Sequence, residues 1–216
     1  MGKVIAIDGP SGAGKSSVSK AIAEKLGFQF LDTGALYRAI ALHLRRKELS
    51  DDALYDETSN AIKGITIAFS NDRVFLNGKD VSDAIRTTEA GHYASIFSAK
   101  KAVRDALLSI QRDAAVNHDV VAEGRDMGTV VFPDAWKKFY LDASEEGRAK
   151  RRYDQLQGKG VEITIEEALN DVRERDLRDS KRDIAPLKKA DDAICIDSTF
   201  LSLDEVVEKI LSCIDE

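Results

Sequence analysis

The sequence has little cysteine and no long hydrophobic run. Its two cysteines, Cys195 and Cys213, lie in an apolar run and on a helical pattern, so we expect buried thiols in a reducing compartment. Asp8 interrupts the first apolar segment, which argues against a signal peptide, and Ala6 stands where N-myristoylation requires Ser or Thr. No apolar stretch is long enough to span a bilayer. We therefore expect a cytoplasmic protein without a membrane partner.

Positive charge is also not in excess. The net charge is −6, which argues against a general nucleic-acid-binding surface. The three histidines, His43, His92 and His118, lack the spacing of metal ligands. A hydrophobic fraction of 43% and a charged fraction of 32% are ordinary for a globular chain, and 216 residues suffice for one good core with a small insert.

The most informative motif lies near the N-terminus. An apolar run at residues 3–8 is followed by GPSGAGKS at residues 9–16 and then by a helical pattern, which is the order that a phosphate-binding P-loop requires. The glycines allow a tight bend with inward N–H groups, and the N-terminal end of the next helix attracts the same anion. Lys15 is placed to reach the β- and γ-phosphates of a nucleoside triphosphate, and Ser16 to bind the accompanying Mg²⁺.

The rest of the chain predicts a doubly wound α/β domain. Buried strands are expected at residues 3–8, 28–32, 120–122, 139–142 and 193–197. Amphipathic helices are expected after the P-loop, after Thr33-Gly34, near residues 99–116, and from the capping residues Ser144, Thr164 and Ser202. Gly27 should end the first helix. A later helix opens with the capping box of Thr164 and Glu167, carries Arg175, Asp179 and Arg182 on one side, and should be stopped by Pro186.

A different pattern interrupts this domain. Residues 65–69 alternate with period two, and short apolar segments follow at residues 74–76 and 79–81. Asn71-Asp72 and Asn77-Gly78 predict the turns between them. We expect a small antiparallel insert of about three strands.

Charged residues follow the expected parallel strands, at the edge where ligands bind in such sheets. They include Arg38, the segment Glu123–Asp126, and arginine clusters around residues 148–152 and 175–182. Arginine binds phosphate with two hydrogen bonds and stays charged, so the clusters indicate a second phosphate-bearing substrate, or lid groups that close over the transferred phosphate.

The clusters also have a structural interpretation. Arg148, Arg151 and Arg152 can form a solvated helix face that pairs with Glu145 or Glu146, and the later cluster can be a surface ion-pair ladder. Arg104 lies off the apolar stripe of its helix, so a surface position is expected for it. From the residues alone both interpretations stay open.

Several separated motifs resemble those of bacterial cytidylate kinases. They are IDGPSGAGKS at residues 7–16, LDTGALYR at 31–38, GRDMGTVV at 124–131, RDLRDSKR at 175–182, APL at 185–187 and DST at 197–199. The resemblance runs from about residue 3 to the C-terminus, in the family's order and spacing.

The resemblance implies ATP-dependent phosphorylation of CMP and dCMP to CDP and dCDP by direct in-line transfer, with Mg²⁺ accompanying ATP. It implies a single P-loop kinase domain over residues 1–216 with a three-layer α/β fold, in which helices cover both faces of a five-stranded parallel sheet. A monophosphate-binding region is expected near residues 35–118, including the insert near 64–85, and a helical lid near 148–162. A monomer that acts on these small molecules, with no nucleic-acid partner, is expected.

The resemblance also implies the site residues. The implied ATP-binding residues are Gly9, Pro10, Ser11, Gly12, Ala13, Gly14, Lys15, Ser16 and Ser17. Of these, Ser16 is also implied to bind the metal ion. CMP binding falls to Thr33, Tyr37, Arg38, Ser95, Arg104, Gly124, Arg125, Asp126, Arg175 and Asp179.

Within this set the resemblance assigns roles. Arg38 and Arg104 hold the CMP phosphate, while Ser95, Arg125 and Asp126 contact the cytosine edge. Arg175 and Asp179 contact the ribose hydroxyls. The catalytic cations are Lys15, Arg151 and Arg182. No strong base is needed, because the acceptor phosphate is already an anionic nucleophile.

Two positions depart from the family pattern. Thr33 stands where most members have Ser, and Glu123 stands where Asp is frequent.

Two other functions are compatible with the residues. Another small-molecule P-loop kinase and a nucleotide-dependent regulatory switch would both use a P-loop. The chain has no Asn-Lys-x-Asp motif of a GTPase, and its arginines suit an acceptor anion better than a switch.

Overall fold

The structure, a computed structural model, describes residues 2–70 and 73–215, apart from the side chain of Asp215. It divides into two compact units: unit 1 comprises Met1–Leu31 and Arg112–Glu216, and unit 2 comprises Asp32–Gln111. The region expected near residues 35–118 overlaps unit 2, while its role and the role of the expected lid stay predictions.

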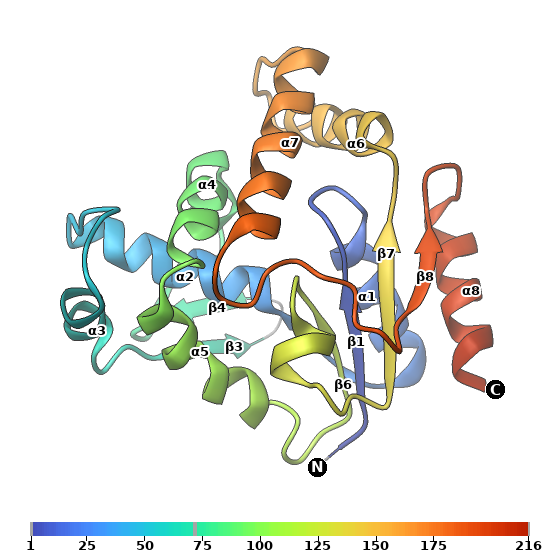
Figure 1. Cartoon of the computed structure of the whole chain (residues 1–216), viewed down its shortest axis with the longest axis horizontal. Coiled ribbons are helices and arrows are strands. Elements are labelled where there is room, and N and C mark those ends of the chain that lie inside the picture. Colours follow the sequence, from blue (N-terminus) through green and yellow to red (C-terminus); the bar gives the residue numbers. More distant parts are fainter. Residues whose placement is uncertain (1, 71–72, 216) are drawn as a thin grey trace. The chain divides into compact units, whose positions relative to one another are not determined.

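Unit 1 contains the parallel sheet (Figure 1). Its elements are β1 (Val4–Asp8), α1 (Lys15–Leu26), β2 (Gln29–Asp32, whose last residue is assigned to unit 2), β6 (Val120–Glu123), the short π-helix η2 (Met127–Val131), β7 (Lys137–Asp142), α6 (Glu145–Gln157), α7 (Ile165–Lys181), β8 (Ile194–Asp197) and α8 (Leu203–Asp215).

The five strands follow the order β2-β6-β1-β7-β8, so the predicted five-stranded parallel sheet is confirmed. β1 pairs in parallel with β6 and with β7, and β7 with β8. In the first pairing Ile7 lies opposite Glu123. This register places the start of the P-loop beside the segment that follows β6.

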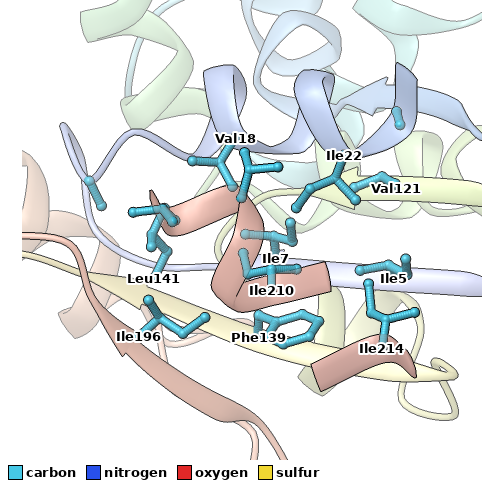
Figure 2. Packing of buried hydrophobic residues seen from close by; sticks show 14 residues of the cluster. Ile5, Ile7, Val18, Ile22, Val121, Phe139, Leu141, Ile196, Ile210 and Ile214 are labelled. Atoms are coloured by element: carbon cyan, nitrogen blue, oxygen red, sulfur yellow. The ribbon is translucent and has the colours of Figure 1, made fainter. Parts of the chain in front are cut away.

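A large hydrophobic cluster of unit 1 lies on one face of this sheet. Alternate residues of the strands, including Ile5, Ile7 and Phe139, pack with Val18 and Ile22 of α1 and with Ile210 and Ile214 of α8 (Figure 2). Both helices therefore cover the same face, since strand side chains alternate between faces with period two.

The helix ends follow local sequence signals. Gly27 ends α1 in the left-handed region with φ 68°, as expected. Thr164 and Glu167 form the expected capping box of α7. The expectation that Pro186 stops α7 is wrong, because α7 ends at Lys181 and Arg182 is its C-cap residue. Arg182 consequently does not continue the helical side that carries Arg175 and Asp179.

Unit 2 contains helices around the antiparallel insert. Its elements are α2 (Thr33–Arg46), α3 (Tyr55–Ile62), β3 (Ile67–Ser70), β4 (Arg73–Leu76), β5 (Lys79–Asp80), the 3₁₀ helix η1 (Ala84–Arg86), α4 (Thr88–Phe97) and most of α5 (Lys101–Asp113). The strands form a sheet with order β3-β4-β5 and antiparallel pairing, so the predicted insert is confirmed.

The insert is held in unit 2 by an apolar cluster. Val74 and Leu76 of β4 pack with Val81, Ile85 and α2. The turn expected at Asn77-Gly78 forms with positive φ at both residues, whereas the turn expected at Asn71-Asp72 lies outside the described residues.

The expectation of buried thiols is wrong. Cys195 is exposed and Cys213 is half-buried. β8 is an edge strand, and of its four residues Ile196 is the buried one. An apolar run on an edge strand therefore does not by itself bury each of its side chains.

Candidate active site

The P-loop connects β1 to α1 in unit 1. Gly9 has φ 149°, and a Cβ there would overlap the carbonyl oxygen of Leu141. Gly14 is the N-cap of α1 with φ 92°, and among the described residues no side chain caps this end. The N–H groups of the first helical turn are therefore available to an anion, as the sequence pattern predicts.

Lys15 is a buried cation at the base of this loop, with 5% of its surface exposed. Its Nζ donates to the carbonyl oxygen of Pro10 at 2.7 Å. Burial, and then the nearby positive charge of Arg125, lower the pKa of Lys15 to about 7. An incoming polyphosphate would favour the charged lysine, so the site is electrostatically complementary to an anion.

Ser16 and Glu123 lie against each other at the same edge of the sheet. The Ser16 hydroxyl donates to Glu123 Oε1. A hydroxyl beside a carboxylate is a donor set of the hard-oxygen kind that Mg²⁺ prefers, so these residues fit the expected ion. Among the described residues, no cluster of three or more His, Cys, Asp or Glu side chains is arranged to hold a metal.

The segment after β6 is held by α7 and the loop that follows it. Arg125 Nε donates to Asp179 Oδ2 at 2.8 Å, and Arg182 Nη2 to Asp126 Oδ1 at 3.3 Å. Burial opposes the charge on Arg125 and on Asp179, but their pairing outweighs it. The pKa of Arg125 is consequently raised, and the pKa of Asp179 is lowered with Arg175 contributing. The later arginine cluster is therefore not a surface ladder.

Asp8 fixes the start of η2. Its two carboxylate oxygens each accept a backbone N–H at 2.8 Å, one from Met127 and one from Gly128. Burial raises the pKa of Asp8 to about 6, against the lowering effect of these bonds. The sequence motifs assign Asp8 no role, although its position at the carboxyl end of a buried strand is a usable signal of one.

The arginines of α6 contact the P-loop. Arg148 Nη1 donates to the carbonyl oxygen of Ser11 at 3.0 Å and also pairs with Asp176. Arg151 Nη1 donates to Ala13 O at 3.3 Å and to Ser198 Oγ at 3.0 Å. The solvated-face interpretation therefore fails for these two residues.

The remaining arginine of that cluster has a structural contact. Arg152 Nε donates to Asp171 Oδ2 at 2.8 Å, which joins α6 to α7. From the sequence, Arg148 has only the two interpretations of its cluster, and Asp176 and Ser198 have no individual role, because their partners are distant in sequence.

Unit 2 holds a second group of expected site residues. Asp32 caps α2 by accepting from Ala35 N at 2.8 Å, and its other oxygen accepts from Arg38 Nη2 at 3.1 Å. Arg104 lies over the Tyr37 ring, 5.6 Å from its centroid, and donates to Ser98 O at 3.3 Å.

Burial agrees with this grouping. Arg104 is buried, so its expected surface position is wrong, and Thr33 and Ser95 are buried as well. Unit 2 thus brings Tyr37 and Arg104 together within itself, and unit 1 brings the P-loop, residues 124–126 and the arginines of α6 together.

None of the helices in the described part of the chain combines the length and the apolar character needed to cross a bilayer.

Comparisons with known proteins agree with the motifs. The family model of cytidylate kinase matches residues 5–216. A cytidylate kinase of Thermodesulfovibrio yellowstonii is 55% identical over 220 residues, covering 100% of this chain and 99% of that protein. A cytidylate kinase of Thermosipho melanesiensis is 51% identical over 212 residues, covering 98% of this chain and 96% of that protein.

A solved structure shares the fold. An uncharacterized protein of Eubacterium ventriosum has a TM-score of 0.53 at 15% identity, over 99% of both chains, and at that identity the likeness concerns the fold alone. The matching family model and the identities over nearly full length have a direct consequence: this chain belongs to the cytidylate kinase family.

Proposed function

We propose that the protein transfers the γ-phosphate of ATP to CMP or dCMP, giving CDP or dCDP. One observation carries the proposal: the hydroxyl of the P-loop residue Ser16 donates to Glu123, the last residue of β6, and the segment with Arg125 and Asp126 follows directly. The triphosphate cradle and a second ligand-binding segment therefore meet at one sheet edge. The names of the relatives supply the nucleotide.

The donor is held by residues 9–17. Lys15 regains its proton when polyphosphate binds and follows the γ-phosphate as charge moves during transfer. Ser16 would hold Mg²⁺ with Glu123 beside it, and the ion, when bound, neutralises phosphate charge. The extra methylene of Glu123 does not prevent contact with the Ser16 hydroxyl.

The resemblance of the motifs assigns the acceptor-binding residues. Arg38 and Arg104 bind the phosphate of the acceptor, and Ser95, Arg125 and Asp126 contact the cytosine. Arg175 and Asp179 contact the ribose hydroxyls, and Thr33, Tyr37 and Gly124 also belong to the CMP-binding set. The buried positions of Thr33 and Ser95 support this assignment.

Charge stabilisation by fixed cations replaces general-base catalysis. Arg151 and Arg182 are both anchored by hydrogen bonds within unit 1, Arg151 to Ser198 and Arg182 to Asp126. Cations already fixed in place need little reorganisation as charge develops on the phosphoryl group. The segment near residues 148–162 acts as a lid that excludes water, whose attack would waste ATP.

The test is a turnover assay with purified protein, ATP and Mg²⁺, following ADP release across CMP, dCMP, UMP and AMP. We expect ADP release with CMP and dCMP far above the blank without acceptor. Turnover only with another acceptor would instead identify a different small-molecule kinase. ADP release equal to the blank with every acceptor would favour a regulatory switch.

A further inference from the structure

An ion pair formed by residues of two helices binds the backbone of the P-loop at Ser11. Asp176 of α7 accepts the Ser11 backbone N–H at 3.0 Å through Oδ1 and pairs with Arg148 of α6 through Oδ2. Arg148 Nη1 in turn donates to the Ser11 carbonyl oxygen at 3.0 Å. Both backbone groups of one P-loop residue are therefore bound by one charged pair.

The pair is itself fixed. The Arg148 side chain is 6% exposed and that of Asp176 is 20% exposed. Arg148 Nε donates to Ala143 O at 3.0 Å, which orients the guanidinium. The backbone of Arg148 also approaches Gly12, where an added Cβ would lie 3.1 Å from its carbonyl oxygen.

The charge of the pair matters next to a phosphate site. Asp176 alone would place a carboxylate beside a loop that must accept a polyphosphate, and Arg148 neutralises it. A salt bridge that only joined α6 to α7 would have no reason to contact the P-loop. Such a pair exists: Arg173 Nε donates to Glu145 Oε2 at 2.8 Å, and both side chains are about half exposed.

We propose that Arg148 and Asp176 are positioning residues for the phosphate donor, which hold the Ser11 backbone so that the P-loop keeps the shape that binds ATP phosphates. The inference rests on the proposed function. Neither side chain is assigned contact with the reacting atoms. They act through the P-loop, so replacing them should weaken the binding of ATP and leave the binding of CMP unchanged.

The experiment measures KM for ATP and for CMP, kcat, and the Kd of a non-hydrolysable ATP analogue by calorimetry. For Asp176→Ala we expect KM for ATP and the analogue Kd to rise tenfold or more, while KM for CMP changes less than twofold. Asp176→Asn should show a smaller rise, because it keeps an acceptor for the Ser11 N–H. Arg148→Lys should also raise KM for ATP selectively, because it loses the guanidinium fork.

The matched control is Glu145→Gln, which breaks the exposed pair between the same helices. It should change both KM values less than twofold. An equal rise for ATP and CMP in the Asp176 and Arg148 variants, no rise in either, or the same ATP-selective rise in Glu145→Gln would overturn the inference. If Asp176→Ala does not fold by circular dichroism, Asp176→Asn and Arg148→Lys decide.

The unsubstituted protein separates the two proposals. If it phosphorylates CMP while the variants lack the donor-selective defect, the positioning role alone is wrong. If it phosphorylates no monophosphate, the proposed function is wrong, and the binding of the ATP analogue to the variants still tests the role of the pair.

Discussion

Lys15 shows how burial prepares a residue for its ligand. Lys15 is 5% exposed, its ammonium group donates to one carbonyl oxygen, and Arg125 lies near it, so its charged form is disfavoured in the free protein. A bound polyphosphate reverses that preference. Binding should therefore be linked to proton uptake.

We expect the affinity for a non-hydrolysable ATP analogue with Mg²⁺ to fall as pH rises above about 7. Below the pKa of about 7 the free lysine is already protonated, and above it a proton must be taken up on binding. The loss should approach about tenfold per pH unit. Calorimetry at pH 8 in buffers of different ionisation enthalpy should show nearly one proton taken up, and Lys15→Met should show none.

Asp8 predicts a pH dependence of stability. Its folded-state pKa of about 6 lies above the unfolded value of 3.8, so the folded protein binds more protons between these values. This contribution is fully present below pH 3.8 and is lost as pH rises through 6, by about 3 kcal/mol. The destabilisation caused by Asp8→Asn should therefore be smaller at pH 8 than at pH 4.5 in urea unfolding, and an equal cost at both would contradict the buried charge.

Arg104 predicts an acceptor-specific effect. Its guanidinium lies over the Tyr37 ring and is proposed to bind the CMP phosphate. Arg104→Ala should raise KM for CMP by more than tenfold and change ATP binding little, since a buried guanidinium–phosphate contact is worth over about 1.4 kcal/mol. Steady-state kinetics with each substrate varied decides the matter, and equal losses for both nucleotides would count against the assignment.

At the scale of elements, the end of α1 depends on backbone conformation. Gly27 has φ 68° and its N–H donates to the last turn, while an added Cβ would meet nothing within 4 Å. The cost of Gly27→Ala is therefore that of the left-handed conformation.

We expect Gly27→Ala to lower the free energy of unfolding by about 1 kcal/mol, or about 2–4 °C in Tm. Gly27→Asn should cost less, because Asn tolerates this conformation. Calorimetric melting of both variants provides the measurement. A larger loss for Asn than for Ala would show that side-chain crowding, not φ, governs the position.

Helices and strands are predictable where the hydrophobic periodicity and the capping or turn residues agree. The sequence predicts the strands of both sheets and the helices α1, α2, α5, α6, α7 and α8, but it does not predict α3 and α4. These two helices begin after the N-cap residues Leu54 and Thr87, which give no clear start signal in the sequence. The expected C-terminus of α7 lies too late, because the helix ends at Lys181 and Ala185, before Pro186, already has positive φ.

At the scale of the molecule, the stability of unit 1 depends on the face covered by α1 and α8. Ile210 is fully buried against Ile7 and its neighbours (Figure 2). Ile210→Ala should cost about 2–5 kcal/mol of unfolding free energy and Ile210→Val about 0.5–1.5. Urea titrations measure both. A cost below 1 kcal/mol for the alanine variant would contradict this packing.

The sequence alone determined the parallel sheet, the insert and the P-loop, because strand periodicity, turn residues and glycine-rich loops are local properties of the chain. It also supplied the family, through motifs in fixed order. Only the tertiary structure decided which arginines meet which carboxylates: Arg148 with Asp176, Arg125 with Asp179, and Arg182 with Asp126. These partners are 28 to 56 residues apart, so folding, not local pattern, brings their charges within hydrogen-bonding distance.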